Sequence, residues 1–194
     1  MRITKIEIFS ASLPLKVPFR IAIGVTVNSR SLFIRIHTDA GFYGIGEANL
    51  LTPVVGETPE TALAAAAFLC KLLIGADPLD AEGLADKLRK AMPTQATTRS
   101  AFDMALWDIL GKAANMPLYA VLGGQRRTIV TDNTVGLETP VVMSGRASDF
   151  AARGFTAIKV KLGTDLATDV ERVRLIRGIR DTETSIHLQS YKTR

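Results

Sequence analysis

Two lysines one residue apart, Lys159 and Lys161, are the side chains in this sequence whose type and spacing could do chemistry. They lie in the run AIKVKLG at residues 157–163. Because side chains along a strand alternate, both lysines would share one face and the apolar residues between them would take the other. A second nearby ammonium and partial removal from water both favour the neutral amine of a lysine. Such a pair could act as a general base toward a proton on carbon.

The segments on either side bear on this chemistry, since an edge strand with two lysines in water gives the same alternation. A helical pattern runs from Pro140 to Arg153 and stops at Gly154, and another runs from Asp165 to about Arg180. Strands that alternate with helices pair in parallel and are usually covered on both faces. We therefore expect the lysines to point into an enclosed space, such as the interior of a barrel.

The second part of the chain, residues 125–194, is predicted to alternate strand and helix throughout. The expected segments are strands at 129–136, 156–162 and 185–188 and helices at 141–153 and 165–180. The run TDNT at residues 131–134 would end the first strand near the two lysines. Parallel α/β proteins place their sites at the carboxyl ends of such strands.

The first part, residues 1–124, is predicted to be an α+β unit. Alternating apolar residues indicate strands at 3–9, 32–36 and 42–48, which we expect to form an antiparallel sheet. Pro18 and Gly24 interrupt the segment 16–28, so a mobile loop is expected there. Helices are predicted from the N-cap Thr58 to Ile74, over 80–92 and over 98–113. Trp107 and Asp108 in the last helix are interpreted as packing residues.

Composition narrows the classes of function. The chain has 194 residues, 47% hydrophobic and 22% charged, which is typical of a globular protein with a real core. Its net charge of +5 comes from scattered basic residues, so nucleic-acid binding is not expected. No apolar run reaches about 18 residues and the amino terminus does not resemble a signal peptide, so we expect no membrane span and a cytoplasmic location.

Several single residues are interpreted as structural. Cys70, the one cysteine, is expected to be a core thiol without a disulfide partner. His37 and His187 have no second ligand at metal spacing, so neither is predicted to bind a metal. Gly41, Gly44 and Gly46 are expected to serve a hairpin, because no phosphate-binding glycine motif contains them.

The order of these parts resembles the enolase superfamily. The resemblance rests on RSAFDMALWDILGK at residues 99–112, followed by PLY at 117–119 and LGG at 122–124. The KVK motif at 159–161 is similar to the muconate-lactonizing-enzyme subgroup. VGET at 55–58 and TDNTVG at 131–136 are similar to the dipeptide epimerases, whose usual substrates are L-Ala-D/L-Glu type dipeptides. The similarity extends to about residue 181. It implies an α+β N-terminal capping domain followed by the first βα units of an incomplete TIM (β/α) barrel.

The resemblance also implies roles for individual residues. Lys161 would be the acid/base lysine on one face of the substrate α-carbon, and Lys159 its partner near the carboxylate. Thr134 matches a substrate-contacting threonine. Residues 16–28 and 49–57 match two cap loops that close over the barrel mouth and select the substrate. Family members use Mg²⁺ to hold the enolate, which agrees with the need of such an anion for a preorganised cation.

Two departures from the family pattern affect these expectations. Gly24 falls where some dipeptide epimerases carry an arginine that binds an acidic side chain of the substrate. Gln189 stands where the family has its first magnesium-binding aspartate, and no residues correspond to the other metal carboxylates or the opposing lysine. About two and a half of eight βα units are present, and the ending QSYKTR looks like the product of a frameshift or premature stop. The chain is therefore expected to lack metal ligands and to be inactive as this fragment.

Three functions remain open from the sequence. The first is an isomerase of the dipeptide epimerase kind, with a small-molecule dipeptide as substrate. The second is another subgroup member, such as a cycloisomerase or an o-succinylbenzoate synthase. The third is a non-catalytic remnant that acts as a binding or oligomerising domain, and homo-oligomerisation is left open in each case.

Overall fold

The computed structural model describes residues 1–176, which fall into two compact units. The first unit comprises residues 1–19 and 25–129. The second comprises residues 20–24 together with the described residues from 130 onward. No helix among the residues that the structure describes is long and apolar enough to cross a membrane.

The first unit contains a three-stranded sheet in the order β1 (Ile3–Ile21), β2 (Gly24–Thr38) and β3 (Tyr43–Asn49). Strands β2 and β3 pair antiparallel, with Ile34 opposite Gly46. Only two residues connect β1 to β2, and a link this short joins antiparallel strands. The antiparallel arrangement predicted from the alternating pattern is therefore confirmed for β2 and β3 and supported for β1.

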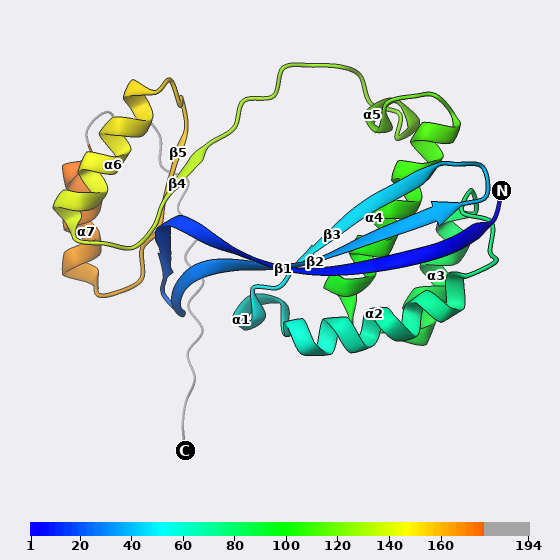
Figure 1. The fold of residues 1–194 in the computed structure, drawn as a ribbon. Helices are drawn as coiled ribbons and strands as arrows, with labels where there is room; N and C mark the ends of the chain where they lie inside the picture. Colours follow the sequence, from blue (N-terminus) through cyan, green and yellow to red (C-terminus); the bar gives the residue numbers. More distant parts are fainter. Residues whose placement is uncertain (177–194) are drawn as a thin grey trace. The chain divides into compact units, whose positions relative to one another are not determined.

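The prediction of a mobile loop over residues 16–28 is wrong, because these residues extend β1 and β2 into a long hairpin (Figure 1). Strand β1 also continues well beyond residue 9, through Pro14 and Pro18. A proline removes a backbone donor, which a sheet tolerates on an edge strand. Strand β1 is such an edge in the order β1-β2-β3. The local breaker signal was therefore outweighed by pairing with β2.

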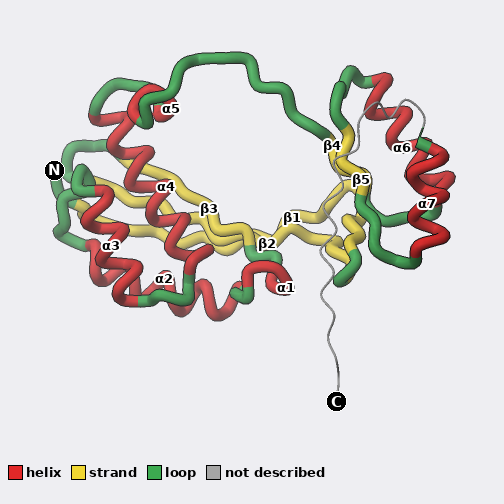
Figure 2. Tube along the Cα trace, turned by 180° about the vertical axis from the view of Figure 1, so that it is seen from behind, coloured by secondary structure: helices red, strands yellow, loops and turns green. Residues whose placement is uncertain are grey.

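Helices of the first unit lie along this sheet (Figure 2). The three longer ones match the predicted segments within about two residues: α2 (Pro59–Leu73), α3 (Ala81–Ala91) and α4 (Ala96–Ala113). Thr58 caps α2, and its side chain accepts a hydrogen bond from the Thr61 N–H while Thr61 bonds back to the Thr58 backbone. This reciprocal capping explains why α2 begins where the sequence predicted. Two short helices, α1 (Thr52–Val55) and α5 (Leu118–Val121), were not predicted.

Helix α4 packs directly on the backbone of β3, at Gly44 and Gly46. A Cβ atom at Gly44 would lie 1.9 Å from the carbonyl oxygen of Ala105, and one at Gly46 would lie 1.8 Å from that of Ala101. These glycines lie in the β2–β3 hairpin as predicted, and they are also needed for the helix to approach, which the sequence did not indicate. Gly41 serves the turn of that hairpin, with a φ of 80°. The core around this contact includes Ile3, Leu32, Ile34, Ile36, Leu69, Leu88, Phe102, Leu106 and Ile109.

The second unit contains a parallel pair of strands, β4 (Asn133–Val135) and β5 (Ile158–Val160), with helices α6 (Pro140–Ala152) and α7 (Leu166–Leu175). Among the described residues, its buried cluster comprises Val135, Met143, Ala147 and Ile176. Both strands are shorter than predicted, because only the residues that overlap their partner are paired. The predicted strand at 185–188 lies outside the described residues.

Candidate active site

The parallel pair of β4 and β5 brings the predicted site residues together. Thr134 lies opposite Lys159 in the register of the two strands. The N–H of Lys161 donates a hydrogen bond of 3.1 Å to the carbonyl oxygen of Val135. The three side chains predicted to meet substrate thus come from adjacent positions of neighbouring strands.

Lys159 lies on the face of β5 opposite to Ile158 and Val160, as the alternation predicted, and Lys161 follows the end of the strand. Ile158 and Val160 pack against the buried cluster of the unit. The prediction that the lysines point into an enclosed space is wrong for the described residues, since Lys159 is exposed and Lys161 is only half-buried. The described sheet of this unit has two strands, which cannot close around a face as a full barrel does.

The tip of the β1–β2 hairpin, residues 20–24, lies beside the segments that follow β4 and β5. The carbonyl oxygen of Arg20 accepts a hydrogen bond of 3.0 Å from the N–H of Leu137. The Nε of Arg20 is 3.4 Å from Oε1 of Glu138. In the segment after β5, a Cβ atom at Gly163 would lie 3.3 Å from the Cβ of Ala22. The predicted cap segment therefore reaches the carboxyl ends of both site strands through its tip.

The second predicted cap segment, residues 49–57, ends at a buried carboxylate. Glu57 is 2% exposed. Its two oxygens accept hydrogen bonds from the backbone N–H groups of Thr97 (2.6 Å) and Thr98 (3.0 Å) and from the Thr98 hydroxyl (2.5 Å). These amides belong to the first turn of α4, whose N–H groups have no partner within the helix. Sequence reasoning noted Glu57 within the VGET motif but did not predict this capping role.

The described residues do not provide a magnesium site. Within residues 1–176, no group of three or more His, Cys, Asp or Glu side chains could hold a metal ion. Nε2 of His37 lies 2.7 Å from Oε2 of Glu7, which agrees with the structural role predicted for this histidine. His187 and Gln189 lie outside the described residues. No magnesium ion is therefore assigned to the described part of this chain.

Asp108, on α4, makes polar contacts with β3, whereas Trp107 packs against the core as predicted. Oδ2 of Asp108 accepts hydrogen bonds from the N–H of Ile45 (3.0 Å) and from Nζ of Lys112 (2.8 Å). Lys112 also donates to the carbonyl oxygen of Tyr43 at 2.6 Å. Strand β3 is an edge of the sheet, so these two side chains satisfy backbone groups that have no partner strand.

Cys70 is half-buried on α2 and packs against the core as a free thiol. Burial raises the pKa of the Cys70 thiol to about 11. A thiol with so high a pKa is a weak nucleophile near neutral pH, so the predicted structural role stands.

Comparison with known proteins identifies the family to which this chain belongs. The model of the mandelate racemase / muconate lactonizing enzyme N-terminal domain matches residues 3–123. A D-Ala-D/L-Ala epimerase from Cytophaga hutchinsonii is 36% identical over 178 residues, which are 91% of this chain and 48% of that protein. A hydrophobic dipeptide epimerase from Enterococcus faecalis is 31% identical over 177 residues, 91% of this chain and 50% of that protein.

Solved structures give the same picture. The dipeptide epimerase from Enterococcus faecalis V583, complexed with Mg and the dipeptide L-Leu-L-Tyr, matches with a TM-score of 0.88 at 31% identity and covers 91% of this chain and 50% of that one. The dipeptide epimerase from Cytophaga hutchinsonii, complexed with Mg and D-Ala-L-Val, matches with a TM-score of 0.88 at 36% identity, covering 91% and 48%. The chain thus spans about half the length of the relatives it matches.

Proposed function

Because the chain belongs to the mandelate racemase / muconate lactonizing enzyme family of the enolase superfamily, we propose that it supplies the capping domain and first βα units of a dipeptide epimerase. The observation that carries the proposal is the placement of Thr134 opposite Lys159, with Lys161 directly after the strand and its N–H bonded to the carbonyl oxygen of Val135. Similarity to several dipeptide epimerases supports the substrate class. The proposed reaction inverts the configuration at the α-carbon of one dipeptide residue.

In the proposed reaction, the neutral amine of Lys161 takes the α-proton from one face of the substrate and becomes an ammonium, and the opposing lysine that the family carries further along the barrel returns a proton to the other face. The ammonium of Lys159 lies near the substrate carboxylate and offsets the negative charge that develops there as the proton leaves. The hydroxyl of Thr134 contacts the substrate from the adjacent strand. Magnesium enters no step assigned to the described residues, because they offer no ligand set for it.

The hairpin tip suggests which dipeptides are preferred. Gly24 carries no side chain and has open space around its Cβ position, where some epimerases place an arginine. Without that charge, an acidic substrate side chain gains no ion pair from this position. We therefore propose that L-Ala-L-Ala type dipeptides are better substrates than L-Ala-L-Glu.

The test uses a hybrid in which residues 1–176 replace the matching part of the Cytophaga hutchinsonii epimerase. Exchange of the substrate α-proton in deuterated water is followed by NMR. We expect the hybrid to catalyse exchange of the α-proton. In the Lys161→Ala hybrid, exchange should be lost for one of the two substrate configurations, since no other described group occupies the position of Lys161. Lys71→Ala, at an exposed lysine of α2, is the matched control and should exchange normally. Undiminished exchange in Lys161→Ala would refute the assigned role.

The 194-residue chain assayed alone is proposed to be inactive. Gln189 places a neutral amide where the family pattern has a metal-binding aspartate, and Mg²⁺ prefers anionic oxygen ligands. Incubation with L-Ala-L-Glu and magnesium should give no exchange above the uncatalysed background. A folded hybrid that also fails to exchange L-Ala-L-Ala would favour the non-catalytic alternative.

A further inference from the structure

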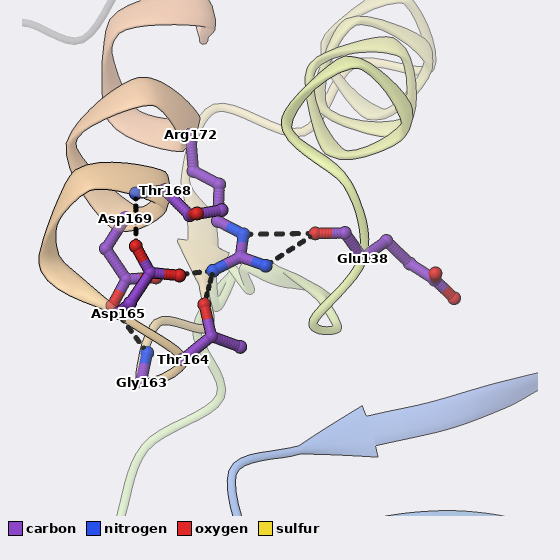
Figure 3. A network of polar contacts seen from close by, with 7 residues as sticks. All are labelled: Glu138, Gly163, Thr164, Asp165, Thr168, Asp169 and Arg172. Atoms are coloured by element: carbon purple, nitrogen blue, oxygen red, sulfur yellow. Dashed lines mark hydrogen bonds and ion pairs between the residues drawn. The ribbon is translucent and has the colours of Figure 1, made fainter.

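Arg172, on α7, is a buried cation in the second unit. It is 5% exposed, beside a buried hydrophobic cluster that has four members among the described residues of the unit. Burying a guanidinium in protein is costly unless its donors are paired. All three nitrogens of Arg172 do have acceptors (Figure 3). Such complete pairing of a buried guanidinium indicates a specific task for this side chain.

Two of the acceptors come from the segments that leave the site strands, and the third comes from α7 itself. Nε (3.0 Å) and Nη2 (2.8 Å) both donate to the carbonyl oxygen of Glu138, which follows β4. Nη1 donates to the hydroxyl of Thr164, just after β5, and to Oδ1 of Asp169, each at 2.5 Å. One rigid, planar group therefore bridges the carboxyl ends of β4 and β5 (Figure 3).

Asp169 extends this bridge to the backbone beside Lys161. Its second oxygen, Oδ2, accepts a hydrogen bond of 2.8 Å from the N–H of Gly163. Gly163 has a φ of 121°, a conformation that side-chain-bearing residues rarely adopt. The Lys161 backbone is thus held on both sides, by its own N–H bond to Val135 and by the bond two residues later at Gly163.

We propose that Arg172 is a positioning residue for Lys161, a role that rests on the proposed function of that lysine. Its guanidinium fixes the spacing between the ends of β4 and β5 and so holds Lys161 next to Thr134. Arg172 itself does not touch substrate. Lysine cannot replace it, because a single ammonium lacks the planar fork that reaches Glu138 and the Thr164–Asp169 side together.

The test measures amide hydrogen exchange by NMR in the 194-residue protein. In Arg172→Lys we expect exchange of the Lys161 and Gly163 amides to speed up about tenfold, because charge-assisted hydrogen bonds in the bridge are lost. Amides within α6 should keep their protection, since a lysine can still pair with Asp169. Arg174→Ala, at an exposed arginine on the same helix, is the matched control and should match the wild type.

If Arg172 only supplied a positive charge to pair with Asp169, the lysine of Arg172→Lys would do the same. The Lys161 amide would then exchange at the wild-type rate. That result would overturn the proposal. Thr164→Val removes one arm of the bridge without changing charge, and it should speed exchange at Lys161 and Gly163 to a smaller degree. Wild-type exchange at both amides in Thr164→Val would likewise count against it.

A second readout is the rate of trace acetylation of Lys161 relative to Lys159, measured by mass spectrometry across alkaline pH. At the most alkaline pH, where access of the reagent rather than protonation limits the reaction, the half-buried Lys161 should react more slowly than the exposed Lys159 in the wild type, and the ratio should approach one in Arg172→Lys. An unchanged ratio would contradict the proposal. Neither readout needs turnover, so a failure of the hybrid epimerase and a failure of this proposal are distinguishable.

Discussion

Thr134 and Lys159 are register partners in the parallel pair of β4 and β5. Val135 pairs with Val160 in the same register and packs with it in the buried cluster. A shift of one residue would exchange the two faces of β5 relative to β4 and separate Thr134 from the lysines. The small apolar cluster of this unit therefore fixes the arrangement of the candidate site.

Loss of the Glu57 carboxylate should destabilise the first unit. In Glu57→Ala, two N–H groups of α4 and the Thr98 hydroxyl would lose a charged acceptor in a buried place. We expect a loss of about 3 kcal/mol in the free energy of unfolding, measured by urea denaturation. Glu60→Ala, at an exposed glutamate nearby, should cost less than about 1 kcal/mol. Equal effects of the two substitutions would argue against the capping role.

A side chain at Gly46 should disrupt the contact between β3 and α4. The Cβ atom of Gly46→Ala would lie 1.8 Å from the carbonyl oxygen of Ala101, so the helix or strand must shift. We expect a loss of about 3 kcal/mol or more by thermal and urea unfolding. Gly145→Ala is the control, because its Cβ meets nothing within 4 Å inside α6, and it should stabilise by about 0.5–1 kcal/mol. A neutral Gly46→Ala would refute the close approach.

Glu7 should make stability depend on pH in the acid range. Hydrogen bonds from Lys5, His37 and Arg35 lower the pKa of Glu7 to about 2. A carboxyl whose pKa is lower in the folded state adds stability above its ordinary pKa, and this contribution is lost as the pH falls. For Glu7 the loss runs from the ordinary value of 4.5 down to about 2.

The measurement compares urea unfolding of the wild type and Glu7→Gln across this pH range. The stability difference between them should shrink as the pH falls from 4.5 toward 2. Glu82→Gln, at an exposed glutamate of α3, controls for the general change in net charge. A difference that stays constant with pH would show that the ion pairs of Glu7 do not contribute to stability.

Within residues 1–176, limited trypsin digestion should cut first after Arg126 or Arg127. Residues 124–132 are exposed and have no regular secondary structure, so their backbone can enter a protease site. Arg99 lies within α4 and should resist. Mass spectrometry of the first fragments checks this, and the double variant Arg126→Gln, Arg127→Gln should slow the first cut. An initial cut within α4 would contradict the prediction.

The sequence alone determined the features that depend on neighbouring residues. The alternation of side chains placed Lys159 and Lys161 on one face of a strand, and Thr58 followed by Pro59 marked the start of α2. These features follow from backbone periodicity and capping, which act over a few residues. The family motifs, read in order, also indicated the capping domain and the dipeptide epimerase relatives.

Only the tertiary structure decided the contacts between distant segments. Glu57 caps a helix that begins about forty residues later, and Gly46 allows that helix to pack closely on β3 because it has no side chain. Residues 16–28 read locally as a loop, yet pairing within the hairpin made them strands. Arg172 shows no local signal for a role at Lys161, because its bridge depends on where β4 and β5 end in space. Such contacts form between segments that packing brings together, and no pattern within a single segment encodes them.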